Sequence, residues 1–429
     1  SLSGIVLGFA APLLVGTILF PGRPPEQQET VVGLTRIMLL SPLFLGLGGW
    51  AMGILNARQH FTLPALAPVF YNLAIIAGAL FLAPTMGVYG LAWGVVAGAL
   101  LHLGVQIPGL LGVGMRYSFR LNLRDEGATR VGRLILPRIL GQAAFQANVI
   151  AMTLIASFLA AGSLSAFNYA YMVMLLPHGV FALSLATVTF PTMSAQFAEG
   201  KLDAMRATLA RAVRVLAFLV VPAAVGMFAL RSELVATLFQ LGKFDAGDTQ
   251  LVASALLYFS LGLVSYALVE VLTRGFYALH DTRTPVLVAV ITVAINLALA
   301  AYLALGVGMA QDGLALSLAV TTTLELILLW VFLGRKLPGW RLASDGMLGS
   351  FGKSGLSALA MGLVLLGVMP LLRGWLPSAG TSKLEAVLLL GVGVTLGGLA
   401  YLAIARILRS EEVDQAVAML TRRFKRRAS

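Results

Sequence analysis

The sequence contains no cysteine and few charged residues. None of its 429 residues is cysteine, and Asp, Glu, Lys and Arg together make up only 11% of the chain. The missing thiols exclude disulfide bonds and thiol chemistry. A typical soluble protein carries about 25% charged residues, so the charged fraction of this chain is unusually low. With four histidines and no HExxH motif, a metal-centred enzyme is also disfavoured. We therefore expect no metal and no cofactor.

A phosphate-binding loop is missing as well. The nearest approach is the glycine-rich stretch GMLGSFGKS at 346–354. A P-loop needs four residues between its first glycine and Gly-Lys-Ser, and this count places Met347 where glycine is required. No catalytic triad stands out elsewhere. We therefore expect that the chain is not an enzyme and does not drive transport with ATP.

Apolar residues dominate what remains, at 59% of the chain with a mean hydropathy of +0.91. Continuous apolar runs of near twenty residues are typical of spanning helices, whereas a transmembrane barrel has short alternating segments. The sequence therefore predicts an all-α polytopic membrane protein with twelve spanning helices. Their predicted ranges are 2–20, 31–55, 63–83, 87–111, 134–160, 164–190, 210–230, 250–274, 285–304, 309–333, 351–371 and 383–406.

Lysine and arginine gather on alternate connecting segments. One set of segments holds 24 of the 30, and the other set holds six. The rich set consists of 56–62, 112–138, 195–214, 274–284, 334–353 and the tail from 406. Because cytoplasmic loops carry the excess of Lys and Arg, this pattern predicts that both termini are cytoplasmic. The net charge of +12 then reflects topology, and no nucleic-acid partner is expected.

Two landmarks occur twice. GILNARQHFTLP at 53–64 resembles GFYALHDTRTP at 275–285, and the GLA segment that starts at Gly90 resembles the one that starts at Gly313. The offsets are 222 and 223, and six spans separate the copies, so a true repeat would be parallel. The alternative is coincidence among Gly- and Leu-rich helices. The second copy of the turn follows the fourth helix of its half, whereas the first copy follows only the second helix of the chain. The repeat therefore predicts two more helices before Ser1, and fourteen helices in all.

The repeat and the charges together predict four parts. These are an incomplete N-terminal lobe of four helices at 1–112, a C-terminal lobe of six helices at 131–336, an extra helix pair at 351–407, and a basic cytoplasmic tail at 411–429. The tail has the pattern of a short amphipathic helix with a basic cluster. We favour the interpretation that the basic cluster is a topology signal, and contact with anionic lipid headgroups is the alternative.

Polar side chains within one predicted span suggest a cavity wall. Arg138, Gln142 and Gln146 recur at a spacing of four residues, so they share one helical face, and Asn148 follows closely. Polar groups are costly in hydrocarbon and therefore face a cavity or a partner. A water-filled cavity and a helix interface held by side-chain hydrogen bonds are equal alternatives here.

Two further spans supply candidate cavity residues. Glu270 and Arg274 lie four residues apart and can pair on one helical face; we favour a structural ion pair, with substrate contact as the alternative. The span at 164–190 adds Asn168 and Tyr171, which are polar but uncharged. These residues complete the predicted site.

Five stretches carry a family resemblance, namely ILNARQHFTLPALAPVFYN (54–72), ASFLAAGSLSAFNYA (156–170), LPHGVFALSLATVTFPTMS (176–194), LFQLGKF (238–244) and FYALHDTRTPV (276–286). They resemble the MurJ (MviN) family of lipid II flippases, which belongs to the MOP exporter superfamily. The resemblance runs over essentially the whole chain.

This resemblance implies fourteen helices in two lobes around a central cationic cavity, with a lipid-tail groove formed by the last two helices. It implies outward movement of an anionic, polyprenyl-pyrophosphate-linked peptidoglycan precursor across the bacterial plasma membrane, with membrane lipids as further partners. It also implies that about two N-terminal helices are absent. The family's Ala-Asp-Arg segment reads Ala170, Tyr171 and Met172 here, so its cavity arginine has no counterpart at this position.

Three functions remain open at this point. The first is a lipid II flippase that works by alternating access. The second is a MOP-type exporter of another lipid-linked oligosaccharide or of drugs, for which Glu270 and Glu325 are the acidic candidates to bind a coupling cation. The third is a non-transporting relative that serves as a scaffold for cell-wall synthesis enzymes.

Overall fold

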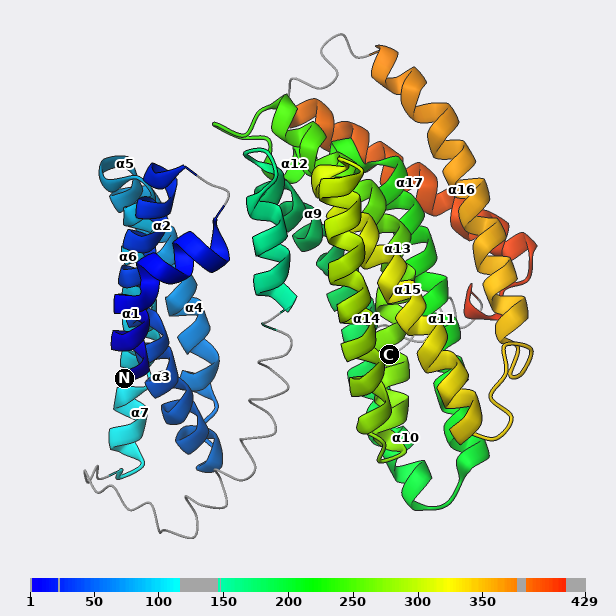
Figure 1. The fold of residues 1–429 in the computed structure, drawn as a ribbon. Coiled ribbons are helices and arrows are strands. Elements are labelled where there is room, and N and C mark those ends of the chain that lie inside the picture. Colours follow the sequence, from blue (N-terminus) through cyan, green and yellow to red (C-terminus); the bar gives the residue numbers. More distant parts are fainter. Residues whose placement is uncertain (1, 22–23, 116–145, 147, 376–382, 414–429) are drawn as a thin grey trace, which may run out of the picture. The chain divides into compact units, whose positions relative to one another are not determined.

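The computed structural model describes residues 2–21, 24–115, 146, 148–375 and 383–413, and all regular structure among them is helical. The chain divides into two compact units, Ser1–Phe158 and Leu159–Ser429 (Figure 1).

The first unit begins with a helix that continues as a π-helix, and a second π segment lies between α4 and α5. Its elements are α1 (Leu2–Leu14), η1 (Val15–Leu19), α2 (Pro25–Met38), α3 (Leu40–Ala57), α4 (Thr62–Ala77), η2 (Gly78–Leu82), α5 (Ala83–Met86), α6 (Val88–Gly104), α7 (Ile107–Gly112) and the helix Asn148–Ser157.

The second unit contains longer helices, two of which continue through a π segment. Its elements are α9 (Ser163–Pro177), η3 (His178–Leu183), α10 (Ser184–Ala198), α11 (Leu202–Ala229), α12 (Arg231–Phe239), α13 (Ala246–Ala278), α14 (Arg283–Ala301), η4 (Tyr302–Gly306), α15 (Ala310–Lys336), α16 (Met347–Trp375) and α17 (Lys383–Ile407).

The predicted all-α polytopic membrane fold is confirmed. Among the described residues, ten helical stretches are long and apolar enough to cross a membrane, and each coincides with a predicted span. The other two predicted spans, 2–20 and 134–160, contain the shorter apolar helices Val6–Thr17 and Asn148–Ser157. The beginning of 134–160 lies outside the described residues. The bounds of the lobes, the helix pair and the tail stay predictions, and only 411–413 of the tail is described.

Small residues allow the helices of the second unit to pack closely. A Cβ atom added at Gly262 of α13 would lie 2.8 Å from the Cα atom of Ala319 in α15, so these two backbones nearly touch. Large side chains on the outer faces are exposed instead, for example Leu359 and Leu363 of α16, each 63% exposed. This arrangement is typical of membrane bundles, where small residues mediate helix contacts and large apolar residues face lipid.

The two predicted copies of the polar turn share one backbone conformation. Gln59 and His280 follow α3 and α13 with left-handed φ angles of 61° and 58°. The next N–H in each copy, that of His60 or Asp281, donates to the carbonyl five residues earlier, at 2.9 and 3.0 Å. Both helices thus end in the same C-terminal capping motif. Gln59 and His280 are 221 residues apart (280 − 59), and the starts of α4 and α14 are separated by the same number of residues. The two copies therefore match through the turn and into the helix that follows it.

The second landmark of the repeat also has a structural counterpart. A Cβ atom at Gly90 of α6 would lie 2.4 Å from the carbonyl carbon of Leu82, and one at Gly313 of α15 would lie 2.8 Å from that of Leu303. In both units the glycine therefore lets a helix start approach the backbone of a π-helical segment, η2 or η4. The matching turns and the matching contacts support the predicted repeat.

Helices α16 and α17 pack on each other and on α11, which carries a proline in its middle. Pro222 has no N–H to donate to the carbonyl of Phe218 four residues earlier. The hydroxyl of Tyr401 in α17 donates to that carbonyl instead, at 2.8 Å. In a membrane an unsatisfied carbonyl is costly, so this bond both repairs α11 and fixes the position of α17.

Candidate functional site

The predicted stripe on the fifth span is only partly visible. Arg138 and Gln142 lie outside the described residues. Gln146 is exposed, and Asn148 is half-buried at the start of the helix Asn148–Ser157. The buried Oδ1 of Asn148 has no hydrogen-bond partner among the described residues. A buried acceptor without a donor is consistent with a wall of a polar cavity. The role of the stripe stays a prediction.

The two candidates on α9 differ in their surroundings. Asn168 is exposed. Tyr171 is half-buried, and its hydroxyl forms a 2.9 Å hydrogen bond with the hydroxyl of Tyr266 on α13. Tyr171 thus joins α9 to the polar face of α13, whereas no such contact within the described part of the chain places Asn168 there.

The predicted pair of Glu270 and Arg274 is present on α13. Nη2 and Nε of Arg274 lie 3.0 and 3.2 Å from Oε1 of Glu270. The two side chains are 28% and 32% exposed, so both charges are largely withdrawn from solvent. Pairing lowers the cost of holding two charges within a membrane span. Whether the pair also contacts a substrate stays a prediction.

A polar cluster surrounds this pair. The ring of His178 in η3 lies 4.7 Å from that of Tyr266, and Glu270 interacts electrostatically with both residues. Glu325 of α15 also interacts electrostatically with Tyr266. We define the C-unit polar cluster as Tyr171, His178, Tyr266, Glu270, Arg274 and Glu325.

Tyr266 was missed by the sequence prediction, although a signal for it exists. Tyr266, Glu270 and Arg274 recur at a spacing of four and therefore form one stripe on α13. The cluster offers charged acceptors, a charged donor and hydroxyl groups within spanning helices. Such a set suits a polar or ionic headgroup better than an apolar ligand.

An apolar groove of about 530 Å³ lies on another side of the second unit. It is bounded by α9, η3, α11, α12, α16 and α17, and includes Leu176, Phe181, Phe218, Leu234, Met361 and Tyr401. These walls are almost entirely hydrocarbon, so the groove suits an acyl or prenyl chain.

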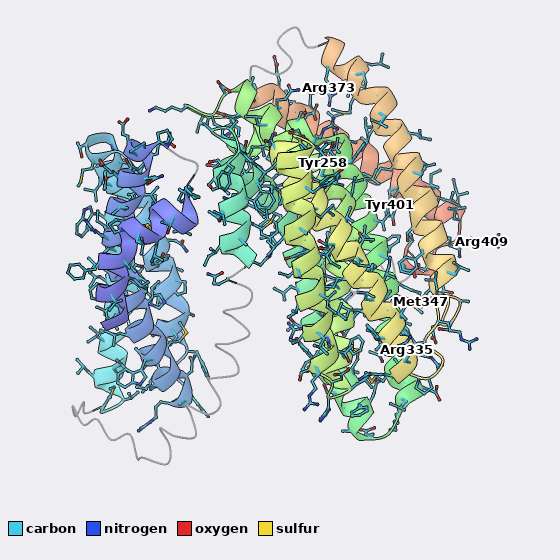
Figure 2. All side chains as sticks on the ribbon, viewed as in Figure 1. Tyr258, Arg335, Met347, Arg373, Tyr401 and Arg409 are labelled. Atoms are coloured by element: carbon cyan, nitrogen blue, oxygen red, sulfur yellow. The ribbon has the colours of Figure 1, made fainter. Side chains whose placement is uncertain are left out.

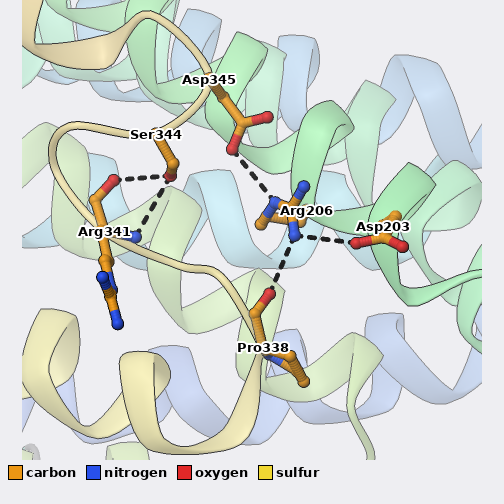
Figure 3. A network of polar contacts seen from close by, with 6 residues as sticks. All are labelled: Asp203, Arg206, Pro338, Arg341, Ser344 and Asp345. Atoms are coloured by element: carbon orange, nitrogen blue, oxygen red, sulfur yellow. Dashed lines mark hydrogen bonds and ion pairs between the residues drawn. The ribbon is translucent and has the colours of Figure 1, made fainter.

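Polar contacts fix α11 to the segment between α15 and α16 (Figure 3). Arg206 near the start of α11 contacts Asp203 at 2.8 Å and Asp345 at 3.2 Å, and donates to the carbonyl of Pro338 at 3.0 Å. The guanidinium of Arg206 therefore joins α11 to two points of one connecting segment. We assign these contacts to structure, because its recorded Nε and Nη1 contacts all go to partners within the protein.

A second polar network holds the segment that follows α17. Burial alone would raise the pKa of Glu412, but hydrogen bonds from Ser410 (2.7 Å) and Ser350 (2.9 Å), together with the charge of Arg214, hold it below its ordinary value. Glu412 is therefore ionised at neutral pH and ties this segment to α11 and α16. Within the described part of the chain, no cluster of three or more His, Asp or Glu could hold a metal ion.

Comparison with known proteins identifies the family. The family model "Lipid II flippase MurJ" matches residues 1–381. This chain belongs to the MurJ family. A MurJ protein of Burkholderia cenocepacia, named "Lipid II flippase MurJ", is 37% identical over 373 residues, covering 85% of this chain and 70% of that protein. A "Probable lipid II flippase MurJ" of Haemophilus influenzae is 32% identical over 358 residues, covering 82% of this chain and 69% of that protein.

Solved structures agree on the MurJ fold. The chain resembles a structure described as "Lipid II flippase MurJ, inward closed conformation", with a TM-score of 0.77 and 24% identity over 95% of this chain and 80% of that one. A multidrug resistance MATE transporter of the MOP superfamily is similar with a TM-score of 0.61 and 16% identity, covering 80% of each chain. The predicted family and fold class are confirmed, and the protein is a transporter-family member rather than an enzyme.

Proposed function

We propose that this protein moves lipid II, the polyprenyl-pyrophosphate-linked peptidoglycan precursor, from the inner to the outer leaflet of the bacterial plasma membrane. The observation that supports this most is the match to the MurJ family over residues 1–381. The relative with 37% identity carries the name of that activity and is matched over 70% of its length.

The second unit offers surroundings for both parts of such a substrate. The apolar groove of about 530 Å³ suits part of a prenyl chain, and the C-unit polar cluster offers groups for a polar headgroup. Arg274 is the cation of this cluster and would act on the pyrophosphate, with Glu270 holding it in position. Gln146, which lies on the predicted polar stripe, and Asn148, which follows it closely in the sequence, stay predicted cavity residues of the first unit.

Alternating access fits a two-unit transporter without an ATP site. With both termini in the cytoplasm, as the Lys and Arg distribution predicts, an anionic headgroup moves outward from a negative interior. Uncompensated movement releases about 2.3 kcal/mol per charge per 100 mV. The membrane potential could therefore drive export, unless accompanying ions cancel the charge.

Depletion of the protein in its own cells tests the function. We expect lipid-linked precursor to accumulate in the inner leaflet, measured by labelling precursor accessible from outside. Re-expression of a Gly398→Phe variant should restore little export, because Gly398 lines the groove and has open space around it. Gly367→Phe is the matched control, since Gly367 also has open space but lies outside the groove on α16. Unchanged export after depletion would refute the proposal.

Drug export is the second candidate, because two acidic residues, Glu270 and Glu325, interact electrostatically with Tyr266 in the membrane. This function predicts loss of efflux when both are replaced by glutamine, with drug accumulation as the measurement. Unaltered efflux in that double variant would exclude it. The scaffold hypothesis, in which the protein binds cell-wall synthesis enzymes, predicts co-purification of such enzymes after crosslinking without any change in precursor export.

A further inference from the structure

The short helix α12 separates two cavities of different character. Leu230 and Leu234 face the apolar groove. Ser232 and Glu233 line a second cavity of about 320 Å³. Other walls of this second cavity, which we call the Glu233 pocket, come from the beginnings of α13 and α17 and the end of α16. They include Thr249, Gln250, Arg373 and Ala386.

The Glu233 pocket lies at one end of the spanning helices. Helices α13 and α17 begin beside it, and α16 ends beside it. Figure 2 shows Arg373 near the end of α16, next to the start of α17. Where three spanning helices begin or end together, the surrounding membrane presents its headgroups rather than its hydrocarbon.

The two carboxylate oxygens of Glu233 differ in their surroundings. Its side chain is 5% exposed, and Nε and Nη2 of Arg373 both converge on Oε1, at 2.6 and 2.5 Å. The other oxygen, Oε2, is buried and has no hydrogen-bond partner among the described residues. Leaving a buried carboxylate oxygen without a donor is costly, so this atom indicates a missing donor.

Arg373 adds the opposite charge at the same pocket. Its side chain is 41% exposed, and neither of its recorded contacts with Glu233 uses Nη1. The pocket therefore combines a buried negative acceptor with a partly exposed positive donor. A free cation would be repelled by Arg373 and a free anion by Glu233, whereas a ligand that carries both charges matches both.

We propose that the Glu233 pocket binds the phosphoethanolamine headgroup of a membrane phospholipid. The primary ammonium donates to Oε2 of Glu233, and the phosphate accepts from Arg373. The hydroxyl and amide groups of Ser232 and Gln250 supply further hydrogen bonds to the phosphate and glycerol oxygens. A choline headgroup has the same charges but no N–H, so it leaves Oε2 without a donor.

This site is separate from the proposed transport function. A lipid seated there contacts α12, α13, α16 and α17 together, and so links the extra helices to the rest of the second unit. The expected consequence is stabilisation of the folded protein by ethanolamine lipid, because a ligand that binds the folded state raises the unfolding temperature.

Thermal unfolding of the purified full chain in detergent tests the site. Ethanolamine phospholipid should raise the unfolding temperature more than choline or glycerol phospholipid with identical acyl chains. Titration should give about tenfold tighter binding for ethanolamine over choline lipid, the effect of one charge-assisted hydrogen bond. Glu233→Gln should abolish this preference, whereas Glu199→Gln should retain it, since Glu199 is exposed and paired with Lys201.

A second variant guards against misfolding of Glu233→Gln. Ala386→Leu adds bulk to the pocket and leaves the Glu233–Arg373 pair intact, so it should also abolish the preference. Equal binding of ethanolamine and choline lipids by the wild type, or a preference that survives in both variants, would overturn the proposal. Soluble glycerophosphoethanolamine forms the last arm. If it reproduces the full stabilisation while the lipid has no effect, a membrane lipid is not the ligand.

Discussion

The repeated segments of the two units share the backbone conformation of a turn and a close glycine contact, but they differ in chemistry. In the first unit, α6 places the buried His102 against Gly48 of α3, where a Cβ would lie 2.5 Å from the ring nitrogen. In the second unit, α13 and α15 instead carry Tyr266, the Glu270–Arg274 pair and a further carboxylate. Charged groups have thus been placed in one copy of a common scaffold.

The difference is sharpest at one pair of equivalent positions. His102 and Glu325 are 223 residues apart, the same offset as Gly90 and Gly313, so each lies twelve residues after its glycine. In the first unit this position is filled by a buried imidazole that packs on a helix. In the second it holds a half-buried carboxylate near Tyr266. Shared geometry therefore does not imply shared function in the two units.

The largest effect should come from the shared glycines. Gly90→Ala and Gly313→Ala force a Cβ against backbone atoms at 2.4 and 2.8 Å, which cannot move as a side chain does. We expect losses of about 3 kcal/mol or less in unfolding free energy, larger at Gly90. Gly349→Ala is the control, because nothing lies within 4 Å of its Cβ position. Equal unfolding free energies of all three variants in denaturant titrations would contradict the structural match between the units.

A smaller effect should follow from uncoupling the ion pair of the second unit. Glu270→Gln leaves Arg274 without its partner and should cost about 1–2 kcal/mol, since both side chains are partly exposed. The double variant Glu270→Gln with Arg274→Gln should regain most of this stability and still lose precursor export. If the double variant exports normally, the pair is purely structural and the units differ less in function than their charges indicate.

The bond from Tyr401 to α11 should contribute about 1 kcal/mol. Tyr401→Phe removes the donor to the carbonyl of Phe218 that Pro222 leaves free. We expect a lower unfolding temperature in detergent. Restoring the N–H with Pro222→Ala in the same chain should recover much of the loss. If the changes in stability of Tyr401→Phe and Pro222→Ala are additive in the combined variant, the hydroxyl of Tyr401 does not replace the missing N–H.

The smallest effect concerns the two turns. Asp281 of the second turn corresponds to His60 of the first (281 − 60 = 221), and it bonds to Lys336 at the end of α15. Burial alone would raise the pKa of Asp281, but hydrogen bonds from Lys336 and Thr284 lower it from 3.8 to about 2. Since the folded-state pKa is the lower one, the bond stabilises the protein above about pH 4.

That stabilisation should disappear as the pH falls from about 4 towards 2. Asp281→Asn should lower the unfolding temperature at pH 7 and flatten this part of the pH profile. Asp203→Asn serves as control, because this carboxylate is 88% exposed and its ion pair with Arg206 therefore contributes little. An unchanged profile in Asp281→Asn would mean that the two turns differ in sequence alone.

The family, the fold class and the repeat could be predicted from sequence, because spanning helices need long apolar runs and a repeated turn recurs as a motif. The pairing of Glu270 with Arg274 was also predictable, since spacing along a helix fixes their distance. Contacts between helices could not be predicted from the sequence. Nothing local to Tyr401 indicates that it bonds to α11, and the surroundings of Glu233 depend on four helices that meet only in the folded chain.

The π segments η2 and η4 widen one helix in each unit. Each is a short widening of a helix, and each lies where a glycine of the next helix makes its close backbone contact. A π segment arises when one extra residue is accommodated within an α-helix. Removing one residue from either segment should therefore turn the side chains on one side of it by about 100° relative to those on the other. The contact between glycine and widened helix makes each of these segments sensitive to a change in length as well as in sequence.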